Sequence, residues 1–200
     1  CHLRAEAFGG VDCAAAGRCW LAVGAGVLVA VAWVAPELPA VGRVWPGFQE
    51  FYYRWLVMMP GELPDYYEPS LFPALTPGHA SLAYAPEEAG WALTLAKLAG
   101  SSLVIAVIEE FFFRGFLYRW LRRGRFWEVP LTAFDAQAFW TVVGVFGLEH
   151  DRWLAGLAAG AVYGWLAVRT GDIWAACVAH GLTNFLLGVY VIASRQYGFW

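Results

Sequence analysis

The sequence of 200 residues has little charge, since Asp, Glu, Lys and Arg make up only 14% of it. A soluble domain of this size carries about 25% of these residues. Apolar residues make up 60% of the chain, and the mean hydropathy is +0.52. This shortage of charge excludes an ordinary soluble domain and indicates a membrane protein. The small net charge of −3 also argues against nucleic acid as a partner.

The sequence also lacks the patterns of a cysteine-based framework. Its four cysteines, Cys1, Cys13, Cys19 and Cys177, have no CxxC spacing and do not cluster with histidine. We therefore expect neither a disulfide framework nor a structural zinc site. Residues 1–18 lack the charged, apolar and small regions that mark a signal peptide in that order. Because the chain begins at Cys1 rather than Met, we expect it to be a fragment that lacks upstream helices.

Long apolar runs are the main feature that is present. A helix needs about 20 apolar residues to cross the hydrocarbon core of a bilayer. The apolar runs cover residues 19–36, 90–121, 136–149, 153–168 and 172–193. They predict an all-α fold, a polytopic bundle of transmembrane helices. The many Trp, Tyr and Phe residues suit aromatic belts at the two lipid–water boundaries.

Residues 36–89 separate the first apolar run from the second. This segment is rich in Pro, Glu and Tyr and contains too many helix breakers to cross a membrane. We predict that it lies outside the bilayer or at its surface. The chain then divides into residues 1–89, with one transmembrane helix at about 19–36, and a helical core over residues 90–200.

Lysine and arginine predict the orientation of these helices. They gather in "RWLRRGR" at residues 119–125, and they are sparse over residues 36–89. Cytoplasmic loops carry an excess of Lys and Arg. We therefore place the N-terminus, residues 119–135 and residues 169–172 in the cytoplasm. Residues 36–89 and the C-terminus are predicted to lie outside.

Polar side chains interrupt three of the apolar segments. The three sets are Glu109, Glu110 and Arg114; Glu149, His150 and Asp151; and His180 and Asn184. Ionisable groups within a membrane are rare and usually face the bundle interior or a wet cavity. Three sets on three segments are more easily explained by one shared site than by three separate causes. We therefore predict an active site inside the membrane.

Spacing predicts different roles for the two adjacent glutamates. Glu110 and Arg114 are four residues apart, so they share a helix face and can form an ion pair. Glu109 is rotated by about 100° from that face and lacks its own cation. An unpaired carboxylate in an apolar site suits a general base, although Glu109 alone could also be a buried acid that only packs the helix. His180 and Asn184 are also four residues apart and point the same way.

His150 reaches such a site only under one condition. Helix rise places Glu109 at ~15 Å and His180 at ~12 Å from the cytoplasmic ends of their segments. If residues 136–149 crossed the membrane fully, His150 would lie near the outer face instead. We therefore predict that segments 136–149 and 153–168 form a short hairpin with its tip inside the membrane. Protein or water must cover such a tip.

Three motifs in this order resemble the CPBP family of intramembrane endopeptidases. They are EExxxR (Glu109, Glu110, Arg114), FxxxH (Phe146 to His150) and HxxxN (His180 to Asn184). This family is related to the type II CAAX prenyl protease and to the Abi proteins of bacteriocin processing and self-immunity. The resemblance covers about residues 90–195. The stretches "AHGLTNFLLGVYVIASRQYGFW" and "AGLAAGAVYGWLAVRTGDIW" resemble more narrowly a bacterial branch that accompanies exosortase and PEP-CTERM sorting systems.

The resemblance implies a glutamate-dependent peptidase. Glu109 and His150 would activate a water molecule, and His180 and Asn184 would stabilise the oxyanion, while the pair of Glu110 with Arg114 would support the site. We expect no cofactor. The zinc alternative would use Glu109, His150 and His180 as ligands, but the HExxH motif is absent.

The resemblance also implies the surroundings of the protein. We expect a multi-pass protein of the bacterial cytoplasmic (inner) membrane, in contact with lipid and with a membrane-associated protein or peptide substrate. The sequence leaves the substrate, the cleavage site and the oligomeric state open. One alternative is a catalytically silent protein of the same fold that acts in protein sorting or immunity. Another is a proton-coupled transporter, for which inverted repeats are expected, and the sequence contains no evident repeat.

Overall fold

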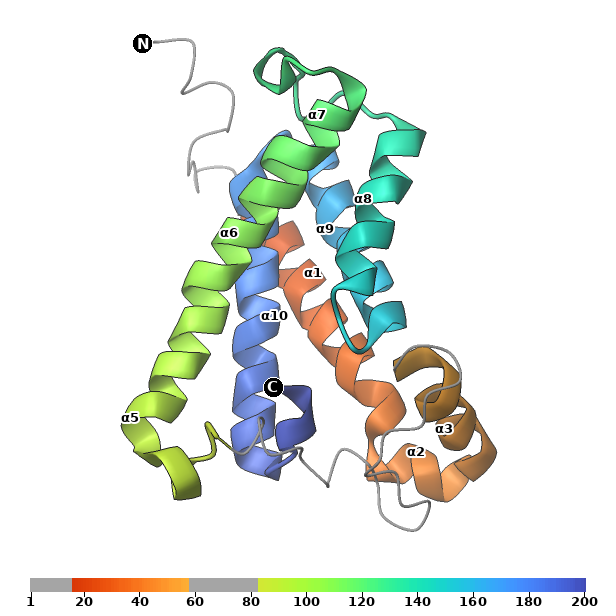
Figure 1. Cartoon of the computed structure of the whole chain (residues 1–200), viewed down its shortest axis with the longest axis vertical. Helices are drawn as coiled ribbons and strands as arrows, with labels where there is room; N and C mark the ends of the chain where they lie inside the picture. The colour runs from red at the N-terminus through yellow and green to blue at the C-terminus, as the bar shows by residue number, and fades with distance from the viewer. Residues whose placement is uncertain (1–15, 58–82) are drawn as a thin grey trace.

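The computed structural model describes residues 16–57 and 83–200. Within these ranges every regular element is a helix, so the predicted all-α fold is confirmed. Three helices among the described residues are long and apolar enough to cross a membrane: Cys19–Glu37, Pro86–Arg122 and Ile173–Ser194. A shorter apolar helix spans Ala136–Leu148. The chain is an integral membrane protein built as a helical bundle (Figure 1).

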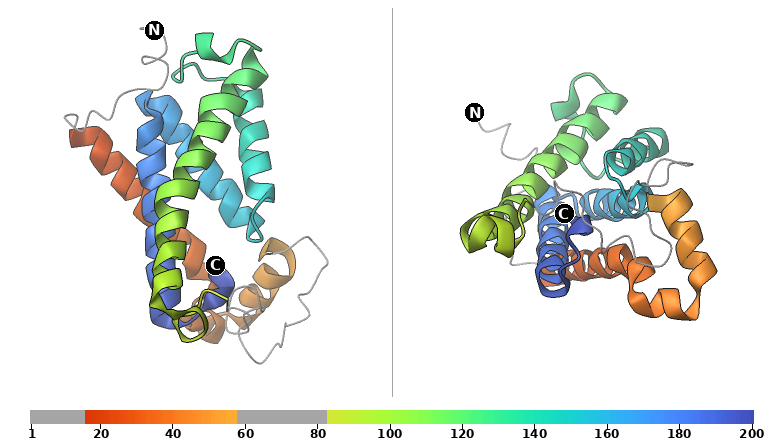
Figure 2. Two further views of the ribbon diagram at one scale, coloured as in Figure 1. Left: turned by 60° about the vertical axis from the view of Figure 1, so that its left-hand side comes forward. Right: turned by 60° about the horizontal axis from the view of Figure 1, so that its bottom comes forward.

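The N-terminal helix is packed into this bundle. Helix α1 (Ala16–Val34) runs beside α10 (Ile173–Ser194) in the views of Figures 1 and 2. The two backbones are so close that a Cβ added at Gly26 would lie 2.6 Å from the carbonyl oxygen of Ala179. Small residues allow such close approach between membrane helices. The hydroxyl of Thr183 adds a hydrogen bond of 2.9 Å to the carbonyl of Gly26.

Short helices follow α1 at the lower end of Figure 1. They are the 3-10 helix η2 (Ala35–Glu37), α2 (Pro39–Val44), α3 (Pro46–Tyr52) and the π-helix η3 (Tyr53–Val57). Proline lies in the first turn of the first three, where it is well tolerated because the first N–H has no helical partner. Glu37 still belongs to the first apolar helix that is long enough to cross a membrane, and each of the helices α2, α3 and η3 has at most seven residues. That residues 36–89 lie outside the bilayer or at its surface stays a prediction. Residues 58–82 of the same segment lie outside the described residues.

The second long helix is divided into α-helical and π-helical parts. It consists of α5 (Pro86–Ala99), η5 (Gly100–Ile105), α6 (Ala106–Glu110), η6 (Phe111–Leu117) and α7 (Tyr118–Arg122). The π-helical segments η5 and η6 flank the short α6, which ends with the two adjacent glutamates. Segments of π-helix are frequent at functional sites. The apolar pattern of the sequence did not predict these segments.

Helices α8 (Ala136–Leu148) and α9 (Trp153–Thr170) form the predicted hairpin. The side chain of Asp135 caps α8 by accepting a hydrogen bond of 2.9 Å from the amide of Ala138. The hairpin turns back part-way along the bundle instead of reaching its lower end (Figures 1 and 2). A Cβ added at Gly156 would lie 3.0 Å from Cα of Gly147, so the two helices touch near the tip.

The ends of the bundle agree with the predicted arrangement. The end of α7, the 3-10 helix η7 (Phe126–Glu128) and the start of α10 lie towards the upper end of Figure 1, and the first turn of α1 lies lower, behind α6 and α10. Helices α2 and α3 and the C-terminal η8 (Tyr197–Phe199) lie at the lower end. The assignment of the upper end to the cytoplasm stays a prediction, as does the division of the chain at residue 89.

Candidate active site

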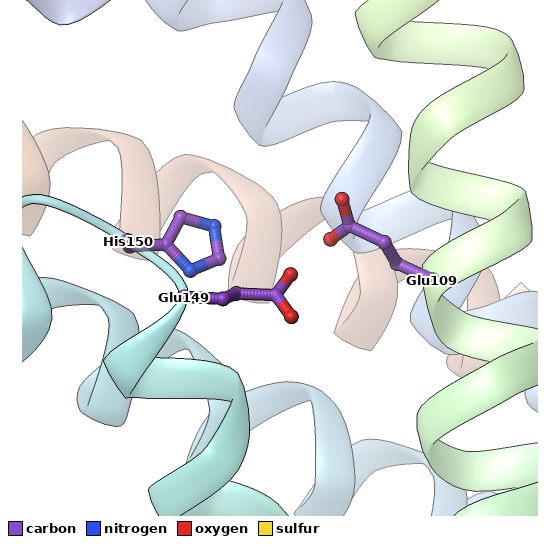
Figure 3. A group of neighbouring side chains, drawn as sticks. All are labelled: Glu109, Glu149 and His150. Carbon is purple, nitrogen blue, oxygen red and sulfur yellow. The ribbon is translucent and has the colours of Figure 1, made fainter.

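The tip of the α8–α9 hairpin meets the middle of the second long helix. Figure 3 shows Glu109 pointing from α6 towards Glu149 and His150 in the loop after α8. One side-chain oxygen or nitrogen atom from each of these three residues lies within 4.8 Å of the others. The predicted proximity of His150 to Glu109 is therefore confirmed. At this separation a single water molecule can bridge the carboxylate and the ring.

The ring of His150 is held by its own helix. Its Nδ1 lies 2.7 Å from the carbonyl oxygen of Phe146. A carbonyl oxygen only accepts hydrogen bonds, so Nδ1 carries a proton and the neutral ring has its lone pair on Nε2. The rings of Phe146 and Trp33 contact the imidazole at centroid distances of 4.8 Å and 5.5 Å. These contacts explain why a polar residue in a short loop is half-buried.

His180 on α10 contacts both glutamates of α6. Its Nδ1 lies 3.0 Å from Oε1 of Glu110, and its Nε2 lies 3.8 Å from Oε2 of Glu109. The ring of Tyr163 stacks on the imidazole with a centroid distance of 4.9 Å and an interplanar angle of 18°. The side chain of His180 is only 5% exposed. The sequence did predict that His180 joins Glu109, but it did not predict the bond to Glu110.

The predicted ion pair between Glu110 and Arg114 is confirmed. The Nη1 atom of Arg114 lies 3.0 Å from Oε1 of Glu110, and both side chains are buried. Arg114 also donates from Nη2 to the carbonyl of Gly160 at 2.9 Å, and its guanidinium lies 4.5 Å from the centroid of the Phe146 ring. One carboxylate oxygen of Glu110 therefore binds both a cation and His180. This network links α6, η6, α9 and α10.

Asn184 lies one helical turn after His180 on the same face of α10. Its Nδ2 donates a hydrogen bond of 3.0 Å to the carbonyl oxygen of Ser101, which belongs to the π-helix η5. An asparagine amide has a second N–H group that can bind a ligand. The bond to Ser101 therefore orients the amide without using both donors.

Glu149 belongs to the second polar set of the sequence, but the sequence assigned it no role in the site. It precedes His150 directly, and the tight loop turns its exposed side chain towards Glu109 (Figure 3). Its place beside His150 was the available signal, but the direction of its side chain could not be read from the sequence. The group of Glu109, Glu149 and His150 has donor atoms that suit a divalent cation such as zinc. His180 Nε2 adds a second histidine donor on the other side of Glu109.

A family model described as type II CAAX prenyl endopeptidase Rce1-like matches residues 91–186. Residues 91–186 belong to this family. The Rce1-like segment contains all three sequence motifs and every residue proposed above for the site. The predicted resemblance to the CAAX protease family is thus confirmed, whereas the exosortase-associated branch stays a prediction. Neither the curated proteins nor the solved structures contain a significant match to the chain.

Proposed function

We propose that this protein is a glutamate-dependent intramembrane peptidase that hydrolyses a peptide bond of a membrane-associated protein. One observation carries the proposal. The carboxylate of Glu109 lies between two histidines, 3.8 Å from Nε2 of His180 and within reach of the ring of His150. The Rce1-like family supplies the reaction class, an endopeptidase.

In the proposed reaction, a water molecule binds between Glu109 and His150. Glu109 takes a proton from this water, and the oxygen attacks the carbonyl carbon of the substrate. The resulting oxyanion accepts hydrogen bonds from the amide of Asn184 and from Nε2 of His180 when that ring holds both protons. Glu109 then passes its proton to the leaving nitrogen. The C–N bond breaks, and a new carboxyl group and a new amine are released.

The neighbouring groups hold these residues in place in the proposed site. Glu110 orients the ring of His180 through Nδ1, and Arg114 holds Glu110 in position. The arrangement supports distinct roles for the two adjacent glutamates, with Glu109 in the chemistry and Glu110 behind it. Glu149 lies beside the proposed water position and adds a second carboxylate there.

We propose this reaction without a metal ion. If zinc bound here, Glu109, His150 and His180 would hold it, with Glu149 close by. The zinc would supply an activated water and polarise the substrate carbonyl. Elemental analysis of the purified chain decides between these versions. We expect no stoichiometric zinc in the wild type, and zinc that disappears in Glu109→Gln would favour the metal version.

Two other functions were open from the sequence. A silent member of the family would be expected to lack a motif residue, and the chain has all of them. A proton-coupled transporter would use the same ionisable groups as a relay, but the match to an endopeptidase family favours proteolysis.

A comparison of the N-termini of membrane proteins tests the proposal without a known substrate. Membranes are compared from cells that produce the wild type, Glu109→Gln or the matched control Glu128→Gln, whose side chain is 41% exposed. We expect new N-termini, identified by mass spectrometry, with the wild type and with Glu128→Gln only. Identical sets of N-termini for all three proteins, at equal protein levels, would refute the proposal.

A further inference from the structure

A second buried ion pair lies immediately next to the site. Arg152 follows His150 by two residues in the hairpin loop, and its Nη2 donates a hydrogen bond of 2.8 Å to Oε2 of Glu37. Its Nε donates to Oε1 of the same carboxylate. Glu37 is fully buried, and Arg152 is 8% exposed. The pair joins the end of the first transmembrane segment to a loop 115 residues later.

The remaining donors of Arg152 bind the C-terminal segment. Nη1 donates to the carbonyl of Gly198 at 2.9 Å, and the guanidinium lies 4.0 Å from the centroid of the Phe199 ring. The hydroxyl of Tyr53 donates to Oε2 of Glu37 at 3.5 Å. Arg152 thus connects the hairpin loop to the end of the first long helix and to the C-terminal segment.

The segments on either side of Glu37 also contact residues that neighbour Arg152 in the chain. Trp33, one turn before Glu37, packs its ring against His150 at a centroid distance of 5.5 Å. Trp153 donates from its indole to the carbonyl of Trp55 at 3.2 Å. Among residues 16–57 and 83–200, the backbone of the loop makes short-range hydrogen bonds, such as that from the amide of His150 to the carbonyl of Gly147 at 3.2 Å. Its position therefore depends on side chains that reach other segments.

We propose that Glu37 and Arg152 are positioning residues that hold the hairpin loop so that His150 stays beside Glu109. Removing two charges from water is expensive, so a buried ion pair is weak evidence for added stability. A bidentate arginine–carboxylate pair does fix the distance and the relative orientation of its two side chains, because two parallel hydrogen bonds hold the guanidinium and the carboxylate in one plane. The role of the pair is therefore geometric, and its importance for catalysis rests on the proposed function.

Spin labels can measure the loop position without any substrate. Labels are placed at two exposed positions, Asp151→Cys in the loop and Gly124→Cys near α7, in the full chain with its native cysteines changed to serine. Double electron–electron resonance in lipid nanodiscs then reports the distance between them. We expect one narrow distribution with Glu37 and Arg152 intact. A second label pair, at Gly47→Cys in α3 and Gly124→Cys, does not include the loop and reports on the distance between α3 and the end of α7.

Two conservative variants separate geometry from charge. Arg152→Lys keeps the positive charge but loses the bidentate geometry, and Glu37→Gln keeps the shape but loses the negative charge. We expect both variants to broaden the distribution of distances between positions 151 and 124. The distribution of distances between positions 47 and 124 should stay unchanged. The matched controls are Arg125→Lys and Glu128→Gln, which alter the exposed ion pair at 3.4 Å. These controls should leave both distributions narrow.

A double variant keeps the test decisive if the single variants do not fold. Replacing both charges by apolar residues, Glu37→Leu with Arg152→Met, removes the desolvation cost together with the pair. We expect thermal unfolding close to that of the wild type but a broadened distribution from position 151. An unchanged narrow distribution in this variant and in Arg152→Lys would overturn the proposal. Failure of the double variant to fold would also overturn it, because the pair would then be required for folding itself.

The appearance of new N-termini, measured with the same variants, separates this inference from the proposed function. A positioning role predicts a lower rate of cleavage when the loop loses its fixed position. If the wild type produced no new N-termini while the variants still broadened the distribution, the proposed function would fail and the positioning role would stand.

Discussion

Nδ1 of His180 lies 3.0 Å from Oε1 of Glu110, a residue on another helix that also binds Arg114. A carboxylate behind a histidine fixes the orientation of the ring and determines which nitrogen carries the proton. Nε2 is thereby directed towards Glu109. The adjacent glutamates thus contact opposite sides of one imidazole, which explains why the sequence needs both of them in an apolar helix.

The variant Glu110→Gln should lower stability strongly. It leaves the buried Arg114 without its anion, and breaking one partner of a buried pair costs about 3–5 kcal/mol. Thermal unfolding in detergent measures the loss, with Glu128→Gln as the exposed control. Normal stability together with lost cleavage, while Glu109→Gln still cleaves, would reverse the roles assigned to the two glutamates.

The variant Asn184→Ala should slow cleavage by roughly 10²–10³-fold, the usual effect of removing one oxyanion donor. The rate at which new N-termini appear gives the measurement. The bond from Asn184 to the carbonyl of Ser101 offers a purely structural explanation. That explanation would be favoured if the variant cleaved at a normal rate and lost only thermal stability.

Alanine at two glycines of α1 should have opposite effects. A Cβ at Gly26 would lie 2.6 Å from the carbonyl oxygen of Ala179, whereas a Cβ at Gly24 would have nothing within 4 Å. We expect Gly26→Ala to destabilise the protein by about 1–3 kcal/mol through overpacking against α10. Gly24→Ala should be neutral or stabilising by up to about 1 kcal/mol, because alanine favours helix. Equal unfolding temperatures for both variants would contradict the close packing of α1 on α10.

Introduced cysteines should label from opposite sides of the membrane. Gly47 and Gly124 are both exposed, and an added Cβ would meet nothing within 4 Å at either position. In a chain with its native cysteines changed to serine, an impermeant maleimide should label Gly47→Cys on intact cells. Gly124→Cys should react only after permeabilisation. The reverse pattern would show that the arginines of residues 119–125 do not face the cytoplasm.

The sequence by itself determined which segments are membrane helices. Long apolar runs have one stable form in hydrocarbon, because a helix satisfies its backbone hydrogen bonds internally. Local spacing was equally informative, since residues four apart share a helix face whatever surrounds them. The pair of Glu110 with Arg114 follows from this rule alone. The hairpin was also predictable, because His150 could join Glu109 in no other way.

Only the tertiary structure decided the contacts between distant segments. The bond from His180 to Glu110, the approach of Glu149 to Glu109 and the pair of Glu37 with Arg152 depend on how each helix is rotated. A helix in a membrane is apolar on the face towards lipid and on the face towards its neighbours. Its apolar pattern therefore does not encode its rotation. Packing of small residues and the pairing of buried charges fix that rotation, and both require the partner helices to be in place.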